Sequence, residues 1–332
     1  MSITEKQIQF FEEIKRLTPA HINPVTEIAD VAEISPYAAK RLARGTTSLK
    51  ICEMTRLAVH YGISLDRLYG LNKGAVEFQY SNLNLADLDQ YDRYLQRLLA
   101  PLKSAAESAD SRAIFVADDI PVFHAMQFPM LIYFKLYAWC CDVNQTDPKI
   151  CFEAFVDELR THHFESVFAT IVSAYEAVPV TEIWTEQTLS PFLRLLDYYR
   201  RLKTFRDEDT AFQLLAELSA LLKKVQRYAE LGKRGIGKRS KLDILLSPVD
   251  PGHGLLYVTH GDHVKVMLQQ HSMNSMWTTD PDYCSEVENV LAGTIRKCSK
   301  LSSTSEIGRN EFFEALQASI NLQTERWGTP HK

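Results

Sequence analysis

Basic side chains gather in one short segment whose chemistry suits nucleic acid. No acidic residue lies between Glu33 and Glu53, whereas the same window holds several cations. Long cationic side chains reach phosphates and base edges, and carboxylates on the same surface would repel both. Hydroxyl groups and a helix N-terminus add further phosphate contacts. The candidate DNA-binding residues are Ser35, Pro36, Tyr37, Ala38, Lys40, Arg41, Arg44, Thr46, Thr47 and Lys50.

The pattern around these residues predicts two short helices joined by a turn. Ser35 is a helix cap, and Pro36 follows at the first helical position, where its missing N–H costs nothing. Ala39 and Leu42 point inward at helical spacing, and Gly45 ends the helix. The second helix is therefore amphipathic with a basic outer face, as a helix that enters the major groove requires.

The helical spacing of apolar residues on both sides of this pair predicts that it belongs to a compact helical domain. Apolar residues recur at helical spacing through most of the first seventy residues, with Gly45 and Gly62 as stops. The predicted helices cover 3–17, 25–33, 36–44, 50–61 and 64–69. We expect residues 1–72 to form this domain and 73–84 to be a linker or an edge strand.

Other constellations that could carry chemistry match their motifs poorly. The loop Gly232–Lys241 approaches a phosphate-binding loop, but Arg239 stands where Ser or Thr would bind magnesium, and the segment follows a helix rather than a strand. We interpret it as a basic loop. His260 and His263 flank a hairpin turn and match no metal-ligand spacing. No catalytic triad or paired-carboxylate site is evident, so we predict no catalytic residue, no metal, no cofactor and no enzyme.

The segment 24–70 resembles the lambda-repressor-like (XRE-type) helix-turn-helix family. The residues that carry the resemblance are Thr26 to Ala29, Ile34-Ser35, Arg44-Gly45 and Leu57 to Tyr69. The resemblance implies a fold of four or five helices and places Pro36, Tyr37, Ala38, Lys40 and Arg41 toward the groove. Ala43 departs from the family, which often has Glu there.

The remainder resembles uncharacterised helix-turn-helix regulators of the Bacteroidetes that have a large helical C-terminal domain. The resembling segments are 117–139, 181–199 and 278–316. Periodicity predicts a mostly helical region, with a short strand over 113–116 and further period-two strands over about 242–278. We therefore expect a mainly α fold, in which 85–330 form a helical regulatory and dimerisation domain with a small antiparallel β-sheet.

Charge and composition fit a cytoplasmic regulator. Residues 1–74 carry 10 Lys and Arg against 8 Asp and Glu, whereas the rest carries 27 against 34. A slightly basic head on an acidic body suits a DNA reader joined to a sensing domain. The six cysteines show no C-x-x-C spacing, which favours reduced thiols in the cytoplasm. The apolar stretch 120–141 contains two prolines and a lysine, so we expect no membrane span.

These observations predict a sequence-specific transcription regulator. One recognition helix contacts few base pairs, so we expect a homodimer on double-stranded DNA. The C-terminal domain would hold the dimer and respond to an effector whose chemistry the sequence leaves open. The alternative is a protein-interaction scaffold whose helix-turn-helix-shaped module does not bind DNA.

Overall fold

The computed structural model describes residues 2–18, 22–70, 74–80, 83, 88–143, 150–235, 239–270, 274–303 and 305–328. The chain divides into two compact units, Met1–Glu77 (unit 1) and Phe78–Lys332 (unit 2). Each unit has its own apolar core.

Unit 1 is helical. Its helices are α1 (Ile3–Leu17), α2 (Pro24–Ala32), α3 (Pro36–Ala43), α4 (Ile51–Tyr61) and α5 (Leu65–Tyr69). One apolar face of each longer helix is buried, and the core centres on Phe10, Ile14, Ile28, Leu42 and Leu57. Packing of these faces is what stabilises such short helices, because isolated helices of this length are marginal in water.

Unit 2 is built on a mixed β-sheet, which corrects the expectation of a mainly α fold with a small antiparallel sheet. Within the described residues the sheet has eight strands in the order β1-β7-β6-β5-β2-β3-β4-β8. The strands are β1 (Gln79–Tyr80), β2 (Arg112–Val116), β3 (Val180–Trp184), β4 (Leu242–Leu246), β5 (Leu255–His260), β6 (His263–Gln270), β7 (Asn274–Thr278) and β8 (Ser299–Lys300). The predicted segment 73–84 thus contributes an edge strand, since β1 pairs with β7.

The sheet has a parallel half and an antiparallel half. Strands β2, β3 and β4 run parallel, whereas β5, β6 and β7 form an antiparallel meander beside β2. The strands expected over 242–278 exist, but β4 pairs in parallel with β3 instead of joining a separate antiparallel sheet. Parallel neighbours need long crossover connections, and helices supply them here.

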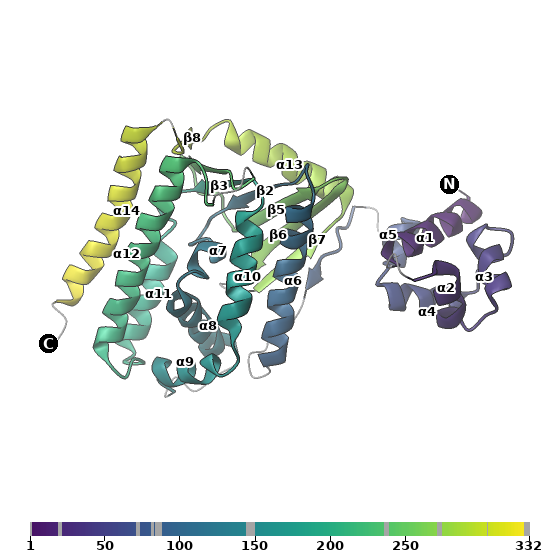
Figure 1. Cartoon of the computed structure of the whole chain (residues 1–332), viewed down its shortest axis with the longest axis horizontal. Helices are drawn as coiled ribbons and strands as arrows, with labels where there is room; N and C mark the ends of the chain where they lie inside the picture. Colours follow the sequence, from purple (N-terminus) through teal and green to yellow (C-terminus); the bar gives the residue numbers. More distant parts are fainter. Residues whose placement is uncertain are drawn as a thin grey trace. The chain divides into compact units, whose positions relative to one another are not determined.

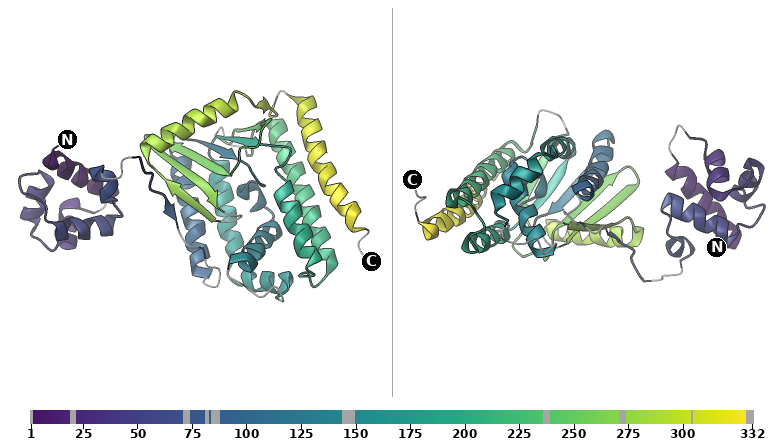
Figure 2. Two further views of the ribbon diagram at one scale, coloured as in Figure 1. Left: turned by 180° about the vertical axis from the view of Figure 1, so that it is seen from behind. Right: turned by 90° about the horizontal axis from the view of Figure 1, so that it is seen from below.

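Helices cover both faces of the sheet very unequally (Figures 1 and 2). The larger core lies on one face of the sheet, which packs there against α6, α8, α10, α11, α12 and α14. On the opposite face the sheet packs against α13. The helices are α6 (Leu88–Glu107), α7 (Val122–Ala125), α8 (Pro129–Val143), α9 (Phe152–Arg160), α10 (Phe164–Glu176), α11 (Ser190–Arg201), α12 (Glu208–Leu231), α13 (Pro281–Ile295) and α14 (Glu306–Trp327).

Strand alternation sorts side chains between these two cores. In β2, Ala113 and Phe115 face the larger core, whereas Ile114 and Val116 face α13. The apolar stretch 120–141 forms α7 and α8, and α8 is buried in the larger core. In the parts of the chain that the structure describes, no helix combines the length and the apolarity needed to cross a membrane.

Candidate nucleic-acid interface

Helix α3 begins and ends where its sequence dictates. The Ser35 hydroxyl accepts a hydrogen bond from the Ala38 N–H at 3.2 Å, and Pro36 occupies the first turn. Gly45 has a φ of +69°, a conformation that glycine adopts without strain. A Cβ at Gly45 would also lie 2.8 Å from Cγ2 of Thr4, so a larger residue would force that side chain to move.

The turn between α2 and α3 fixes how the second helix projects. Glu33 is in the left-handed conformation, with φ 56° and ψ 48°, and the Ile34 N–H donates to the Ala29 carbonyl at 2.9 Å. Glu33 also pairs with Arg56 of α4. Ala39 and Leu42 then bury one side of α3 in the core, which leaves the opposite side to solvent.

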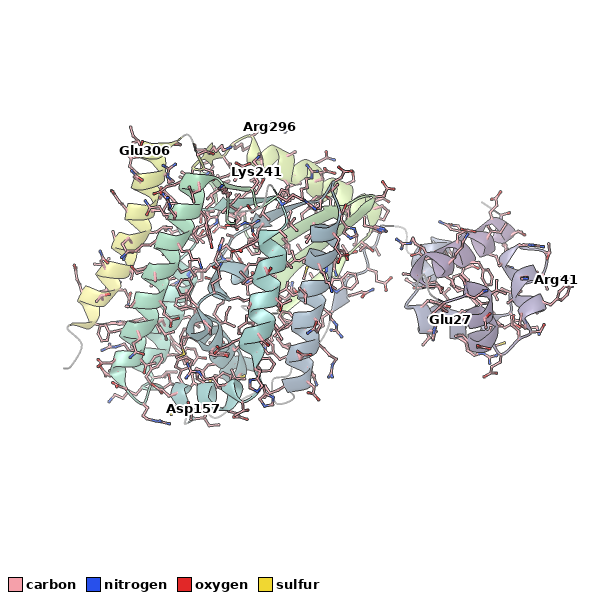
Figure 3. The ribbon with its side chains drawn as sticks, viewed as in Figure 1. Glu27, Arg41, Asp157, Lys241, Arg296 and Glu306 are labelled. Atoms are coloured by element: carbon pink, nitrogen blue, oxygen red, sulfur yellow. The ribbon has the colours of Figure 1, made fainter. Side chains whose placement is uncertain are left out.

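The structure places the predicted DNA-binding residues on this solvent side and in the loop that follows. Tyr37 is 72% exposed, and only Ala38 is half-buried. The exposed members of the set are Ser35, Pro36, Tyr37, Lys40, Arg41, Arg44, Thr46, Thr47 and Lys50. Figure 3 shows the Arg41 side chain extending away from the body of unit 1. We call the exposed side of α3, with the loop 44–50, the basic face.

The cations of the basic face differ in their partners. Among the described residues, Lys40, Arg41 and Arg44 make no ion pair with a carboxylate. The Arg41 guanidinium lies 6.0 Å from the centre of the Tyr37 ring, within range of a cation–π contact. Lys50 instead lies 3.8 Å from a Glu53 carboxylate oxygen. The charges of α3 are therefore available to an external anion.

One residue that the sequence reasoning missed holds the loop of the basic face in place. The buried Gln7 amide on α1 donates to the Leu42 carbonyl at 2.7 Å and to the Thr47 carbonyl at 2.8 Å. Its oxygen accepts from the Leu49 N–H at 3.0 Å. Gln7 thus satisfies backbone groups at both ends of the loop, which otherwise lacks regular structure. The signal in sequence is weak, because Gln7 merely shares the apolar face of α1.

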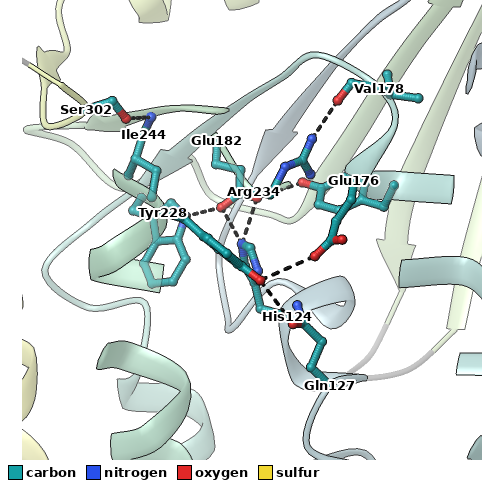
Figure 4. A network of polar contacts seen from close by, with 11 residues as sticks. His124, Gln127, Glu176, Val178, Glu182, Tyr228, Arg234, Ile244 and Ser302 are labelled. Atoms are coloured by element: carbon teal, nitrogen blue, oxygen red, sulfur yellow. Dashed lines mark hydrogen bonds and ion pairs between the residues drawn. The ribbon is translucent and has the colours of Figure 1, made fainter. Parts of the chain in front are cut away.

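Unit 2 contains a second polar cluster, buried between β3 and the helices α7 and α10 (Figure 4). Glu182 of β3 is fully buried and lies 2.8 and 2.9 Å from Nε2 of His124. Tyr175 donates to the same carboxylate at 2.7 Å, and the Trp184 indole N–H donates at 2.9 Å. Burial alone would raise the pKa of Glu182, but His124, Arg234 and these hydrogen bonds outweigh it and lower the pKa to about 2.

This cluster joins an acid to a base, yet its burial argues for a structural role. Both Glu182 and His124 are within 1% of complete burial, so no substrate atom reaches them. Arg234 lies 4.3 Å from the centre of the Tyr175 ring and donates to the Val178 carbonyl at 2.5 Å. A buried charge stays in a fold only when it is paired and hydrogen-bonded, and the Glu182 carboxylate meets both conditions.

The loop 232–241 uses its arginines inside unit 2. It leaves α12 through Gly232, which is in the left-handed conformation, and Lys233 forms an isolated β-bridge with Lys241. Arg239 donates to the Ala105 and Ala106 carbonyls at the end of α6. Arg234 and Arg239 are therefore engaged with the protein backbone, whereas residues 236–238 lie outside the described residues.

The histidines near the β5–β6 turn do not assemble a metal site in the part of the chain that the structure describes, where no three His, Cys, Asp or Glu side chains are arranged to hold an ion. The rings of His260 and His263 pack with their centres 5.0 Å apart across the hairpin.

Comparisons of the chain with protein-family models, curated proteins and solved structures found no match.

Proposed function

We propose that this chain is a cytoplasmic, sequence-specific DNA-binding transcription regulator of the lambda-repressor-like kind. Helix α3 enters the major groove, where Tyr37, Ala38 and Arg41 approach base edges. Lys40, Arg44 and the loop through Thr46, Thr47 and Lys50 contact phosphates. The observation that carries the proposal is an exposed, capped helix whose cations have no carboxylate partner among the described residues.

The arrangement of α2 and α3 supports this reading. The two helices pack through small and apolar residues, with a tight left-handed turn at Glu33 between them. Such a pair lets the first helix cross the DNA backbone while the second lies in the groove. Because one such helix reads only a few base pairs, we propose a homodimer in which unit 2 sets the spacing of two half-sites.

Salt dependence of binding tests the role of the basic face. Full-length protein is titrated against a short fluorescent duplex of mixed sequence at several NaCl concentrations. Each phosphate contact contributes about 0.9 to the magnitude of the slope of log K against log salt, so Lys40→Ala/Arg41→Ala, which removes the phosphate contact of Lys40, should reduce that magnitude by about one. Binding at low salt should weaken as well.

A matched variant separates the contribution of the basic face to binding from the contribution of net charge alone. Lys15→Ala/Arg16→Ala removes the same charge from α1 of the same unit, where both cations lie next to carboxylates of Glu12 and Glu13. It should leave the slope close to the wild-type value. Equal losses in both variants, or no binding by wild type, would contradict the proposal and favour a protein-interaction scaffold.

A further inference from the structure

A cavity of about 60 Å³ lies in unit 2, at the point where the two halves of the sheet meet. Residues that follow the carboxyl end of β2 line it on one side, and the start of β5 lines it on the other. In open α/β sheets, ligands bind in crevices beyond the carboxyl ends of parallel strands, and this cavity lies at that end of β2. Here β2 pairs with parallel β3 on one edge and with antiparallel β5 on the other.

Most of the cavity wall is apolar. Helix α6 contributes Tyr94 and Leu98, and the sheet contributes Phe115, Leu256 and Met267. By the volume that one water needs, roughly 10–15 Å³, the cavity has room for about four to six water positions. A branched hydrocarbon group of a few carbons matches this size and lining.

One end of the cavity is polar and almost completely shielded from water. Lys135 is 3% exposed and Asn274 is 1% exposed, and both line the cavity together with Gln269 and Ser275. The Lys135 ammonium donates to Oδ2 of Asp119 at 2.8 Å. An ammonium carries three N–H donors, so this contact leaves donors for a ligand oxygen.

The charges around this end discriminate between ligands. Lys135 is already neutralised by Asp119, and Asp118 is the next residue, with Oδ1 buried and without a hydrogen-bond partner. Burial and the charge of Asp119 raise the pKa of Asp118. A ligand carboxylate would add negative charge beside both aspartates, and a ligand ammonium would lie against Lys135. Either charge would therefore be desolvated beside a like charge, whereas a neutral polar group avoids that cost.

We propose that this cavity binds a small uncharged molecule with an apolar, branched body and an amide or carbonyl oxygen. The oxygen accepts from Lys135, and the rest of the polar group lies at the end of the cavity that Gln269, Asn274 and Ser275 line. The apolar body lies over Phe115, Leu256 and Met267. This binding goes beyond DNA recognition and does not depend on it.

Calorimetric titration of the full chain with three probes of one carbon skeleton tests the proposal. The probes are 2-methylpropanamide, 2-methylpropanoate and 2-methylpropylammonium. The amide should bind at least about tenfold more tightly than either charged probe. A charged probe that binds as tightly as the amide would overturn the proposal, and so would failure of the amide to bind.

A substitution that fills the cavity locates the site. Ser275→Leu places a branched side chain in the polar end and should weaken binding of the amide at least about tenfold. Ser299→Leu is the control, because Ser299 lies on β8, outside the cavity lining. A Ser275→Leu protein with the wild-type circular dichroism spectrum and unchanged amide affinity would refute the assignment. If this variant does not fold, the comparison of the three probes on the wild-type protein still tests the proposal.

Discussion

Replacing Glu182 by Gln should reveal how much the buried cluster of unit 2 stabilises the fold. The carboxylate accepts hydrogen bonds from Tyr175 and Trp184 and faces His124 and Arg234. Glutamine keeps the shape of the Glu182 side chain but removes its negative charge. Its NH₂ group would also face the O–H and N–H donors of Tyr175 and Trp184. Removing one partner from a buried pair typically costs ~3–5 kcal/mol, because the remaining charge is left uncompensated.

The lowered pKa of Glu182 gives the size of the pH-dependent part of its contribution to the free energy of unfolding. A pKa that falls from 4.5 to about 2 on folding corresponds to about 3 kcal/mol in favour of the ionised, folded state. Because the folded pKa is the lower one, this contribution is complete above pH 4.5. It is lost as the pH falls from there toward 2. The deficit of Glu182→Gln relative to wild type should therefore shrink by about 3 kcal/mol across that range.

Urea unfolding monitored by tryptophan fluorescence measures this effect. Every tryptophan of the sequence lies in unit 2, so the signal reports that unit alone. Glu153 and Asp243 also have lowered pKa values, but they are present in both proteins, so their contributions cancel in the difference. Exposed Glu186→Gln is the control and should differ from wild type by less than about 0.5 kcal/mol. A Glu182→Gln deficit that does not change with pH would refute the reasoning.

Two further substitutions test the hydrogen bonds of Gln7 in unit 1 and the close packing around Gly254 in unit 2. Gln7→Leu should destabilise unit 1 by about 2–3 kcal/mol and speed amide hydrogen exchange at Leu49, because the buried Gln7 side chain loses three hydrogen bonds. Gln9→Leu, at an exposed position of α1, should do neither. Gly254→Ala should cost about 1–3 kcal/mol in urea unfolding, because its Cβ would lie 2.5 Å from a carboxylate oxygen. Gly293→Ala meets nothing closer than 3.7 Å, and equal costs for both alanines would contradict this explanation.

The elements of unit 1 could be predicted because local signals agree there. Ser35, Pro36 and Gly45 mark both ends of α3, and its apolar residues repeat at helical spacing. The exposure of the basic face follows from the same periodicity. Gln7 could not be predicted, because its partners Leu42, Thr47 and Leu49 are brought to it only by the packing of α1 against the following helices.

The mixed sheet of unit 2 escaped prediction for a physical reason. Strand β3 is only five residues long, and Glu182 at its centre interrupts the apolar run that marks a buried parallel strand. Its neighbours β2 and β4 lie far away in the chain, so no local pattern shows the pairing. The period-two strands over 242–278 were visible, but periodicity does not show that β4 joins β3 and that β5 joins β2.

The arginines of the loop 232–241 show the same limit. Glycine and basic residues predict a basic loop, and in the structure Arg234 and Arg239 donate to carbonyls of Val178, Ala105 and Ala106. These carbonyls belong to segments that only the folded chain brings close. Composition describes what a loop contains, whereas tertiary packing decides which of its charges remain available.

Selection from fragmented genomic DNA tests the central proposal most directly. Purified full-length protein is mixed with the fragments, and the retained DNA is sequenced beside that retained by Lys40→Ala/Arg41→Ala. We expect wild type to enrich a two-fold symmetric site with half-sites about one helical turn apart, and the variant to lose that enrichment. No enrichment, or the same fragments retained by both proteins, would contradict DNA recognition by α3.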